Sequence, residues 1–323
     1  MIPYEWILDA AIRISPYIQR TPISHDDHGL LKDVFFKWEN HQVTGSFKAR
    51  GALNKILSLK KWEVDQGLVT ASAGNHGQGV ALAGKIVGAK TTVFVSEHGS
   101  PSKIEAMREL GAEIRLVKGG YGEAEREALK FAHTEGLIWV SPYNDGQVIT
   151  GQGTIASEVL DEYPQLDKAT WIVPAGGGGL VSGIGAGLSN LPLPPRLVAV
   201  QSTVSPFLHS LFYKGTQDKV IELPSLADGL SGPVEENSVT IPLVKKYVDD
   251  IILVTEEEIK TAIAVCWQRF HERIEGAAAT TLAAILSNKI QARPAVLIIS
   301  GGNIDTSIFE QILASYASSL VNG

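Results

Sequence analysis

Apolar runs rich in β-branched residues alternate along the chain with segments whose apolar residues recur at helical spacing. This alternation predicts an α/β fold with mainly parallel sheets flanked by helices, because parallel strands are joined by crossover helices. The predicted strands are VFFKWEN (34–40), LVTASA (68–73), KTTVFVS (90–96), EIRLVKG (113–119), LIWVSPY (137–143), TWIVPAG (170–176), RLVAVQS (196–202), IILVTEE (251–257) and AVLIIS (295–300).

The spacing of these strands divides the chain into two parts. Strands between about residues 65 and 142 are joined by short helices and predict a compact unit, and those from Trp171 onward predict a second sheet. No low-complexity linker separates the parts. We therefore expect two interleaved domains, a large one of residues 1–52 and 143–323 and a small one of residues 53–142.

Composition and charge exclude several classes of protein. The net charge of −7 gives no basic field for a nucleic-acid backbone. Cys266, the single cysteine, lies in an apolar helical pattern, which excludes a disulfide within one chain and indicates a buried position. Residues 1–15 lack the apolar core of a signal peptide, so we expect a cytoplasmic protein. Residues 171–195 are uncharged, but their glycines and prolines favour a strand, a glycine loop and a short helix over a membrane span.

The stretch GSFKARG (45–51) places a lysine where a predicted strand gives way to a predicted helix. Ser46 or Thr44 is a plausible N-cap, which puts Lys48 in the first turn, where the helix dipole disfavours a cation. Arg50 adds a second unfavourable charge. Both effects lower the pKa of the Lys48 amine, as partial burial would, and suit it to act as a nucleophile or base. The alternative is a solvated lysine near a frayed helix end.

A glycine-rich turn is the strongest local signal for a bound anion. PAGGGGL (174–180) ends a predicted strand and opens a helix, so the backbone N–H groups of Gly176, Gly177, Gly178 and Gly179 can surround a phosphate. Ser182 stands where a dinucleotide fingerprint has its third glycine, and no carboxylate ends the next strand. A phosphate monoester fits better, with a turn needed only for tight packing as the alternative.

A second strand-to-helix turn, SAGNHG (72–77), suits a carboxylate. Ser72, Ala73, Gly74, Asn75 and His76 bring small residues and hydrogen-bonding side chains to a helix start. Taken alone, His76 is more often structural than catalytic, and Asn75 could be only a helix cap. Two anion-binding turns beside an unusual lysine nevertheless indicate one site.

Two further polar residues stand at ends of predicted elements. Ser300 follows the strand AVLII and points into the crevice where ligands of α/β sheets bind, unless it only caps the helix that starts near Asp305. Glu275 precedes the alanine-rich helix of residues 277–286, where a helix-start charge and a site residue are equally good interpretations. Tyr143 and Asn144, after LIWVS, are expected near the substrate or cofactor.

Together these motifs resemble the fold-type II pyridoxal phosphate (PLP) enzymes, specifically the group of threonine/serine dehydratases (ammonia-lyases) and serine racemases. The resemblance covers nearly the whole chain in family order and implies a fold similar to the tryptophan synthase β subunit. It rests on RTP (20–22), GSFKARGA (45–52), SAGNHGQGVA (72–81), GQGTIASE (151–158), PAGGGGL (174–180), ADGL (227–230) and SGGN (300–303).

The resemblance implies a role for each candidate residue. Lys48 would carry PLP as a Schiff base, and Gly176 to Gly179 would hold its phosphate. Phe47 would pack against the ring, Asn75 would bind the 3′-oxygen, and Ser300 would meet the pyridine nitrogen. The loop of residues 72–76 would bind the α-carboxylate of the substrate.

The implied reaction is elimination of the β-hydroxyl from L-threonine, L-serine or a related hydroxy-amino acid, giving a 2-oxo acid and ammonia. PLP serves as the electron sink and Lys48 as the base for the Cα proton. An amino-acid racemase and a non-catalytic PLP-binding protein are the alternatives. Serine racemases place a second serine where this chain has Ala73, which favours dehydration.

The resemblance also bears on partners and regulation. Family members that bind a divalent cation carry carboxylates where this chain has Gln201 and Phe207, so we expect no metal. The family suggests a homodimer, with a small-molecule amino acid as the ligand and neither nucleic acid nor membrane as a partner. The chain ends soon after the last core helix, so we expect no C-terminal regulatory domain and no feedback by isoleucine.

Overall fold

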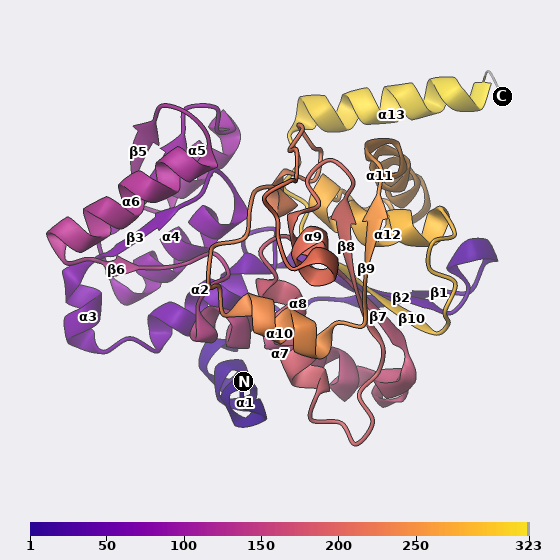
Figure 1. Cartoon of the computed structure of the whole chain (residues 1–323), viewed down its shortest axis with the longest axis horizontal. Helices are drawn as coiled ribbons and strands as arrows, with labels where there is room; N and C mark the ends of the chain where they lie inside the picture. Colours follow the sequence, from indigo (N-terminus) through magenta and orange to yellow (C-terminus); the bar gives the residue numbers. More distant parts are fainter. Residues whose placement is uncertain (322–323) are drawn as a thin grey trace.

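The computed structural model describes residues 1–321 and contains two β-sheets with helices on both faces (Figure 1). The larger sheet has the order β1-β2-β10-β7-β8-β9, and all neighbours run parallel except β1 and β2. The smaller sheet, β5-β4-β3-β6, is entirely parallel. The strands are β1 Ile23–Asp26, β2 Val34–Trp38, β3 Leu68–Ala71, β4 Thr91–Ser96, β5 Glu113–Val117, β6 Ile138–Trp139, β7 Thr170–Pro174, β8 Leu197–Ser202, β9 Asp250–Val254 and β10 Ala295–Ile299.

Helices bury the apolar faces of both sheets. On the larger sheet, α11 and α12 cover one face and α7, α8, α9 and α10 the other. On the smaller sheet, α6 covers one face and α4 and α5 the other. The helices are α1 Tyr4–Ile14, α2 Lys48–Leu57, α3 Lys61–Gln66, α4 Asn75–Val87, α5 Pro101–Glu109, α6 Tyr121–Glu135, α7 Gly146–Glu162, α8 Gly179–Leu188, α9 Phe207–Lys214, α10 Thr240–Tyr247, α11 Glu256–Phe270, α12 Gly276–Leu286 and α13 Thr306–Val321, with 3₁₀ turns η1 Gly29–Leu31, η2 Glu39–His41, η3 Pro164–Lys168 and η4 Asp228–Leu230.

The predicted α/β class and every predicted strand are confirmed. Strands β2, β3, β7, β8 and β10 are buried along their whole length, which is why they stand out in the sequence as continuous apolar runs. Cys266 is fully buried in α11 as expected. Residues 171–195 form β7, the glycine loop and α8, and no helix within the described chain is long and apolar enough to cross a membrane.

Strand β1 was missed because its sequence, ISHD, has one buried residue and no apolar alternation. The strands of the smaller sheet all lie between residues 68 and 139. The domain boundaries at residues 52 and 142 stay a prediction.

Helix α2 lies between α4 and α7, at the junction of the two sheets (Figure 1). A Cβ atom at Gly151 of α7 would lie 2.6 Å from the carbonyl oxygen of Arg50 and 2.7 Å from the Cα of Gly51. On the other side, a Cβ atom at Gly79 of α4 would lie 3.1 Å from the carbonyl oxygen of Lys48. The missing side chains let both helices touch the backbone of the first turns of α2, which fixes the position of Lys48.

Candidate active site

A cavity of about 770 Å³ lies where β3, β7 and β10 end. Ligands of α/β sheets bind beyond the carboxyl ends of parallel strands, so the location is the expected one. The residues to which the resemblance assigns a role all line this cavity: Phe47, Lys48, Ser72, Ala73, Gly74, Asn75, His76, Gly176, Gly177, Gly178, Gly179 and Ser300.

Lys48 is the first residue of α2, and its side chain is partly buried in the cavity wall. The amine donates a hydrogen bond to the carbonyl oxygen of Pro142 at 2.9 Å and lies 5.3 Å from the ring centroid of Phe47. Burial lowers the pKa of the Lys48 amine to about 8, and the negative charge of Glu275 partly opposes this shift. The amine therefore loses its proton far more readily than that of a solvated lysine, although most of it is still protonated near pH 7.

The capping predicted for α2 is wrong. Phe47 is the N-cap residue and makes no side-chain capping bond, whereas Ser46 pairs with Gly301 in an isolated antiparallel bridge. The Phe47 N–H donates to the carbonyl oxygen of Ser300 at 3.0 Å. Contacts with the segment after β10, rather than a capping serine or threonine, thus set the start of this helix.

Arg50 does not act as a second free charge beside Lys48, contrary to the expectation from the sequence. Its guanidinium is fully buried and bound by Glu39 at 2.7 and 2.8 Å and by Glu158 at 2.6 and 2.9 Å. Lys37, also fully buried, donates to Glu158 at 2.6 Å. We call Lys37, Glu39, Arg50 and Glu158 the buried quartet. Its charges balance, and the two carboxylates raise the pKa of Arg50 against the opposing effect of burial.

The glycine loop after β7 fits a phosphate group. Within the described chain, none of the backbone N–H groups of residues 176–181 donates to a protein acceptor. Residues 176–180 line the cavity at the positive end of α8, which suits an anion. The packing alternative also holds in part, because a Cβ atom at Gly177 would lie 2.5 Å from the ring of Tyr143 and Gly178 has a φ of 86°.

The turn after β3 likewise presents free donors. The N–H groups of Ala73, Asn75 and His76 make no hydrogen bond to the described protein, and they lie at the start of α4. Gly74 is the N-cap residue, so the interpretation of Asn75 as a helix cap is wrong. The Asn75 side-chain amide instead donates to both oxygens of Glu275, at 2.8 and 3.0 Å.

His76 is buried in the wall of the cavity. Its Nε2–H donates to the carbonyl oxygen of Val140 at 3.0 Å, which leaves Nδ1 unprotonated and without a partner among the described residues. Burial lowers the pKa of His76 to about 3, with a further contribution from the nearby charge of Lys48. The ring is therefore neutral throughout the physiological range.

Ser300 and Glu275 both belong to the cavity. Ser300 is 2% exposed and lies well before the first residue of α13, Thr306, so it does not cap that helix. Glu275 is the N-cap residue of α12 but makes no capping bond, since its carboxylate is bound by Asn75. Desolvation raises the pKa of Glu275. The interpretation of Glu275 as a mere helix-start charge is therefore wrong.

Tyr143 and Asn144, which lie between β6 and α7, have different surroundings. Tyr143 lines the cavity, and its hydroxyl accepts a hydrogen bond from the Glu235 N–H at 2.9 Å. Asn144 instead donates to the Glu235 carboxylate at 2.7 Å and accepts from the Val239 N–H at 2.9 Å. Asn144 therefore fixes the loop of residues 235–239 and does not line the cavity.

Sequence reasoning missed Lys103, Tyr121 and Glu125, which line the same cavity from α5 and α6. Tyr121 donates to Glu125 at 2.8 Å, and burial raises the pKa of the Glu125 carboxyl. Such residues in polar helices give no local signal, because their pattern is that of a solvated face.

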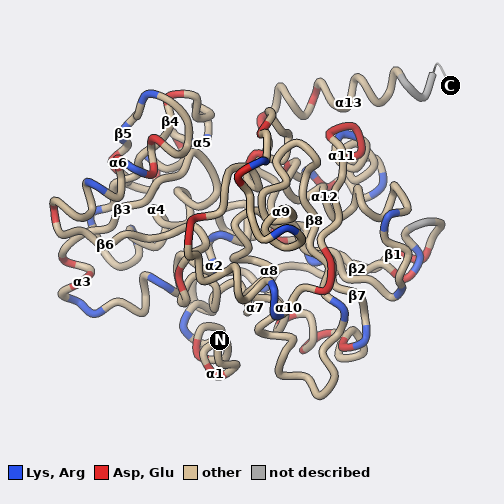
Figure 2. The backbone as a smooth tube through the Cα atoms, in the orientation of Figure 1, with Lys and Arg blue, Asp and Glu red and all other residues tan. Residues whose placement is uncertain are grey.

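At the positions where cation-binding family members carry carboxylates, the structure has an amide and a helix start. The Gln201 side-chain oxygen accepts from the His209 N–H at 2.7 Å, and Phe207 is the first residue of α9. Acidic and basic residues are interspersed along the backbone of the whole described chain (Figure 2). The expected absence of a metal stays a prediction.

Known proteins resemble the chain over most of its length. It is 38% identical over 322 residues to an L-threonine ammonia-lyase of Geobacter sulfurreducens, covering 97% of this chain and 78% of that one. It is 37% identical over 315 residues to the catabolic L-threonine dehydratase TdcB of Escherichia coli K12, covering 95% and 94%. The structure of maize serine racemase matches with a TM-score of 0.88 and 31% identity, covering 98% of each chain.

The model of one protein family, described as pyridoxal-phosphate dependent enzyme, matches residues 14–301. This span contains every residue predicted for the site, and the free N–H groups of the glycine loop fit the phosphate of the cofactor. The chain belongs to the family of pyridoxal-phosphate dependent enzymes.

Proposed function

We propose that the chain is a PLP-dependent ammonia-lyase that eliminates the β-hydroxyl of L-threonine, L-serine or a related hydroxy-amino acid. The products are a 2-oxo acid and ammonia. The observation that carries the proposal is the Lys48 amine, with its pKa lowered to about 8, in a cavity lined by two turns with free N–H groups. The similarity to L-threonine ammonia-lyases supports the substrate class.

PLP, when bound, supplies an electron sink that stabilises negative charge at the Cα of the substrate. Lys48 would hold the cofactor through its amine and, once released, take the Cα proton as a general base. Gly176 to Gly179 would bind the phosphate through their N–H groups, and residues 72–76 would bind the α-carboxylate. The Asn75 amide, which donates to both oxygens of Glu275, would turn an N–H to the 3′-oxygen, while Ser300 would face the pyridine nitrogen.

The proposal is tested on the purified protein with its cofactor. It should show a visible absorption band and release 2-oxo acid and ammonia from L-threonine or L-serine. Lys48→Ala should lose both the band and the activity. Lys55→Ala is the matched control, because Lys55 lies in the same helix but pairs with Asp145 at 2.7 Å. Elimination by the Lys48→Ala variant would sink the proposal.

A racemase is the second candidate, favoured by the similarity to maize serine racemase. Ala73, which lines the cavity, has no hydroxyl to protonate the opposite face of Cα. Incubation with L-serine in heavy water distinguishes the two: deuterated D-serine would support racemisation, and pyruvate without D-serine elimination. Bound cofactor without any product from a panel of hydroxy-amino acids would indicate a non-catalytic PLP-binding protein.

We also infer that the protein is a cytoplasmic homodimer, as its family suggests. Light scattering should then give a mass twice the 34.7 kDa of the chain, and the mass of a single chain would contradict the dimer. Fractionation of the native cells should recover the protein with the cytoplasm.

A further inference from the structure

The cavity contains an excess of acidic groups. Among the described residues that line it, the lysine and arginine side chains are Lys48 and Lys103 alone. The negatively charged carboxylate of an amino acid therefore enters a negatively charged cavity, and this carboxylate needs a positively charged partner. Lys48 is committed to the cofactor, which leaves Lys103. The acidic lining residues are Glu123, Glu125, Glu222, Asp228, Glu275 and Asp305.

Lys103 lies beside the turn that is expected to bind the α-carboxylate. It belongs to the first turn of α5, and its side chain is 14% exposed. A Cβ atom at Gly74 would lie 3.7 Å from the Cδ and 4.0 Å from the Nζ of Lys103. The ammonium thus lies beside Gly74, between the two residues Ala73 and Asn75 whose N–H groups are free, where it can add a charge to the binding of a carboxylate at this turn.

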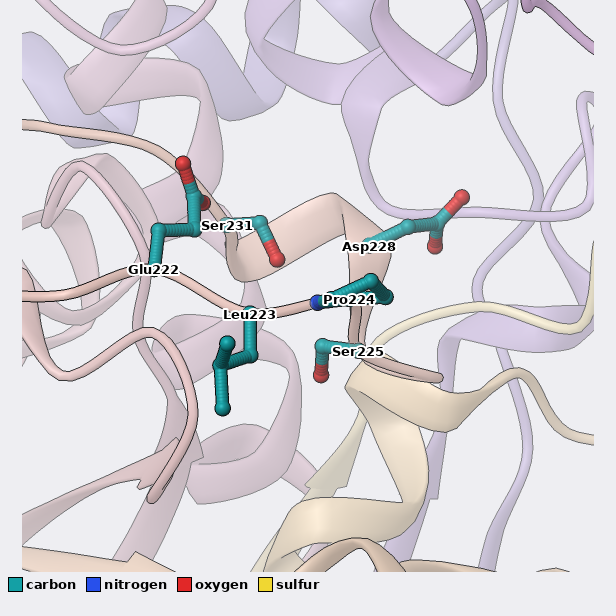
Figure 3. Close-up of a pocket in the computed structure, with 6 residues that line it drawn as sticks. All are labelled: Glu222, Leu223, Pro224, Ser225, Asp228 and Ser231. Carbon is teal, nitrogen blue, oxygen red and sulfur yellow. The ribbon is translucent and has the colours of Figure 1, made fainter.

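The present partner of Lys103 is weak. Its ammonium lies 3.5 Å from the Asp228 carboxylate and makes no hydrogen bond within the described chain. The Asp228 side chain is 67% exposed, and in Figure 3 it points away from Ser225 and Leu223. An ion pair of this length with an exposed carboxylate contributes little free energy, so a substrate carboxylate can replace Asp228 at low cost.

We propose that Lys103 is the counter-ion of the substrate α-carboxylate and exchanges Asp228 for that carboxylate when the substrate binds. The inference rests on the proposed function and adds a specificity. One cation matches one carboxylate, and a second carboxylate on Cβ, as in 3-hydroxyaspartate, would meet acidic groups such as Glu125. The substrate class is therefore the monocarboxylic hydroxy-amino acids.

The test measures binding of L-alanine, which has the α-carboxylate but no leaving group, through the visible absorption of the cofactor-loaded enzyme. Lys103→Met should raise the apparent Kd about 10- to 100-fold, the range for one lost charge-assisted contact, and Lys103→Arg should restore most of the affinity. Lys90→Met, which removes a lysine paired with Glu113 at 3.6 Å on the outer surface, should change nothing. Asp228→Asn should tighten binding up to about 5-fold, because the competing charge is gone.

Kinetics give a second measurement. Lys103→Met should raise the KM for L-threonine by a similar factor with a much smaller change in kcat, and the unmodified enzyme should prefer L-threonine to L-threo-3-hydroxyaspartate. Unchanged binding of L-alanine by Lys103→Met, or an equal loss in Lys90→Met, overturns the proposal. If Lys103→Met loses the cofactor, the Asp228→Asn variant provides the test instead. Unchanged or weaker binding of L-alanine by Asp228→Asn also overturns the proposal. A native protein without cofactor or activity would instead contradict the proposed function.

Discussion

The buried quartet makes a quantitative prediction about the helix that carries Lys48. Arg50→Leu removes one of two cations and leaves Glu39 and Glu158 with Lys37 alone. Glu39 is fully buried and the Glu158 side chain is 14% exposed, so water cannot take over the lost hydrogen bonds. The variant therefore holds an uncompensated negative charge in the interior.

Removing one partner of a buried ion pair costs about 3–5 kcal/mol, and we expect a value in this range for Arg50→Leu. A typical domain has a free energy of unfolding of about 5–15 kcal/mol, so the loss is a large fraction of the total. Arg50→Leu with Glu39→Gln restores the charge balance, because Lys37 and Glu158 remain paired at 2.6 Å. The double variant should recover about 2 kcal/mol or more relative to the sum of the single variants.

The assay is urea unfolding of the cofactor-free protein, followed by circular dichroism and tryptophan fluorescence. Arg126→Leu is the control, since Arg126 forms an Arg–Glu pair of 2.5 Å on the surface of α6, and its loss should leave the unfolding midpoint nearly unchanged. A cost below about 1 kcal/mol for Arg50→Leu, or additive single and double variants, would refute the assignment of the quartet as a coupled unit.

Three further predictions concern Lys48 and its helix. Because burial lowers the pKa of Lys48 to about 8, the rate at which the cofactor-free protein captures PLP should rise with pH, reach half its plateau near pH 8 and level off about one pH unit higher. Stopped-flow absorbance measures this rate, and a rise that continues to pH 10 would contradict the shift. Glu275→Gln removes the charge that opposes this shift, so the plateau should begin at lower pH in the same assay. Gly151→Ala should destabilise the protein by about 1–3 kcal/mol in urea because its Cβ would overlap Arg50 and Gly51, whereas Gly146→Ala in the same helix has 3.9 Å of room and should be neutral or stabilising.

The strands and the two turns with free N–H groups could be predicted from the sequence because both leave local signals. A strand buried on both faces needs an uninterrupted apolar run, and a turn with free N–H groups needs glycine or a small residue. The partners of Arg50 could not be predicted in this way, since Glu158 lies 108 residues further along the chain. Lys103 was missed for the same reason, because only the folded chain brings α5 beside Gly74.

Lys48 and Arg50 show why the local pattern predicted the lowered pKa of Lys48 for an incomplete reason. Both cations lie in the first turn of α2, and burial acts to lower the pKa of each. The Arg50 side chain meets the carboxylates of Glu39 and Glu158, which outweigh burial and raise its pKa. Lys48 meets the carbonyl oxygen of Pro142 and no carboxylate within hydrogen-bonding distance among the described residues, so burial prevails and lowers its pKa. The partners on each side of the helix, rather than the helix dipole that acts on both, therefore decide which of the two cations loses its proton more readily.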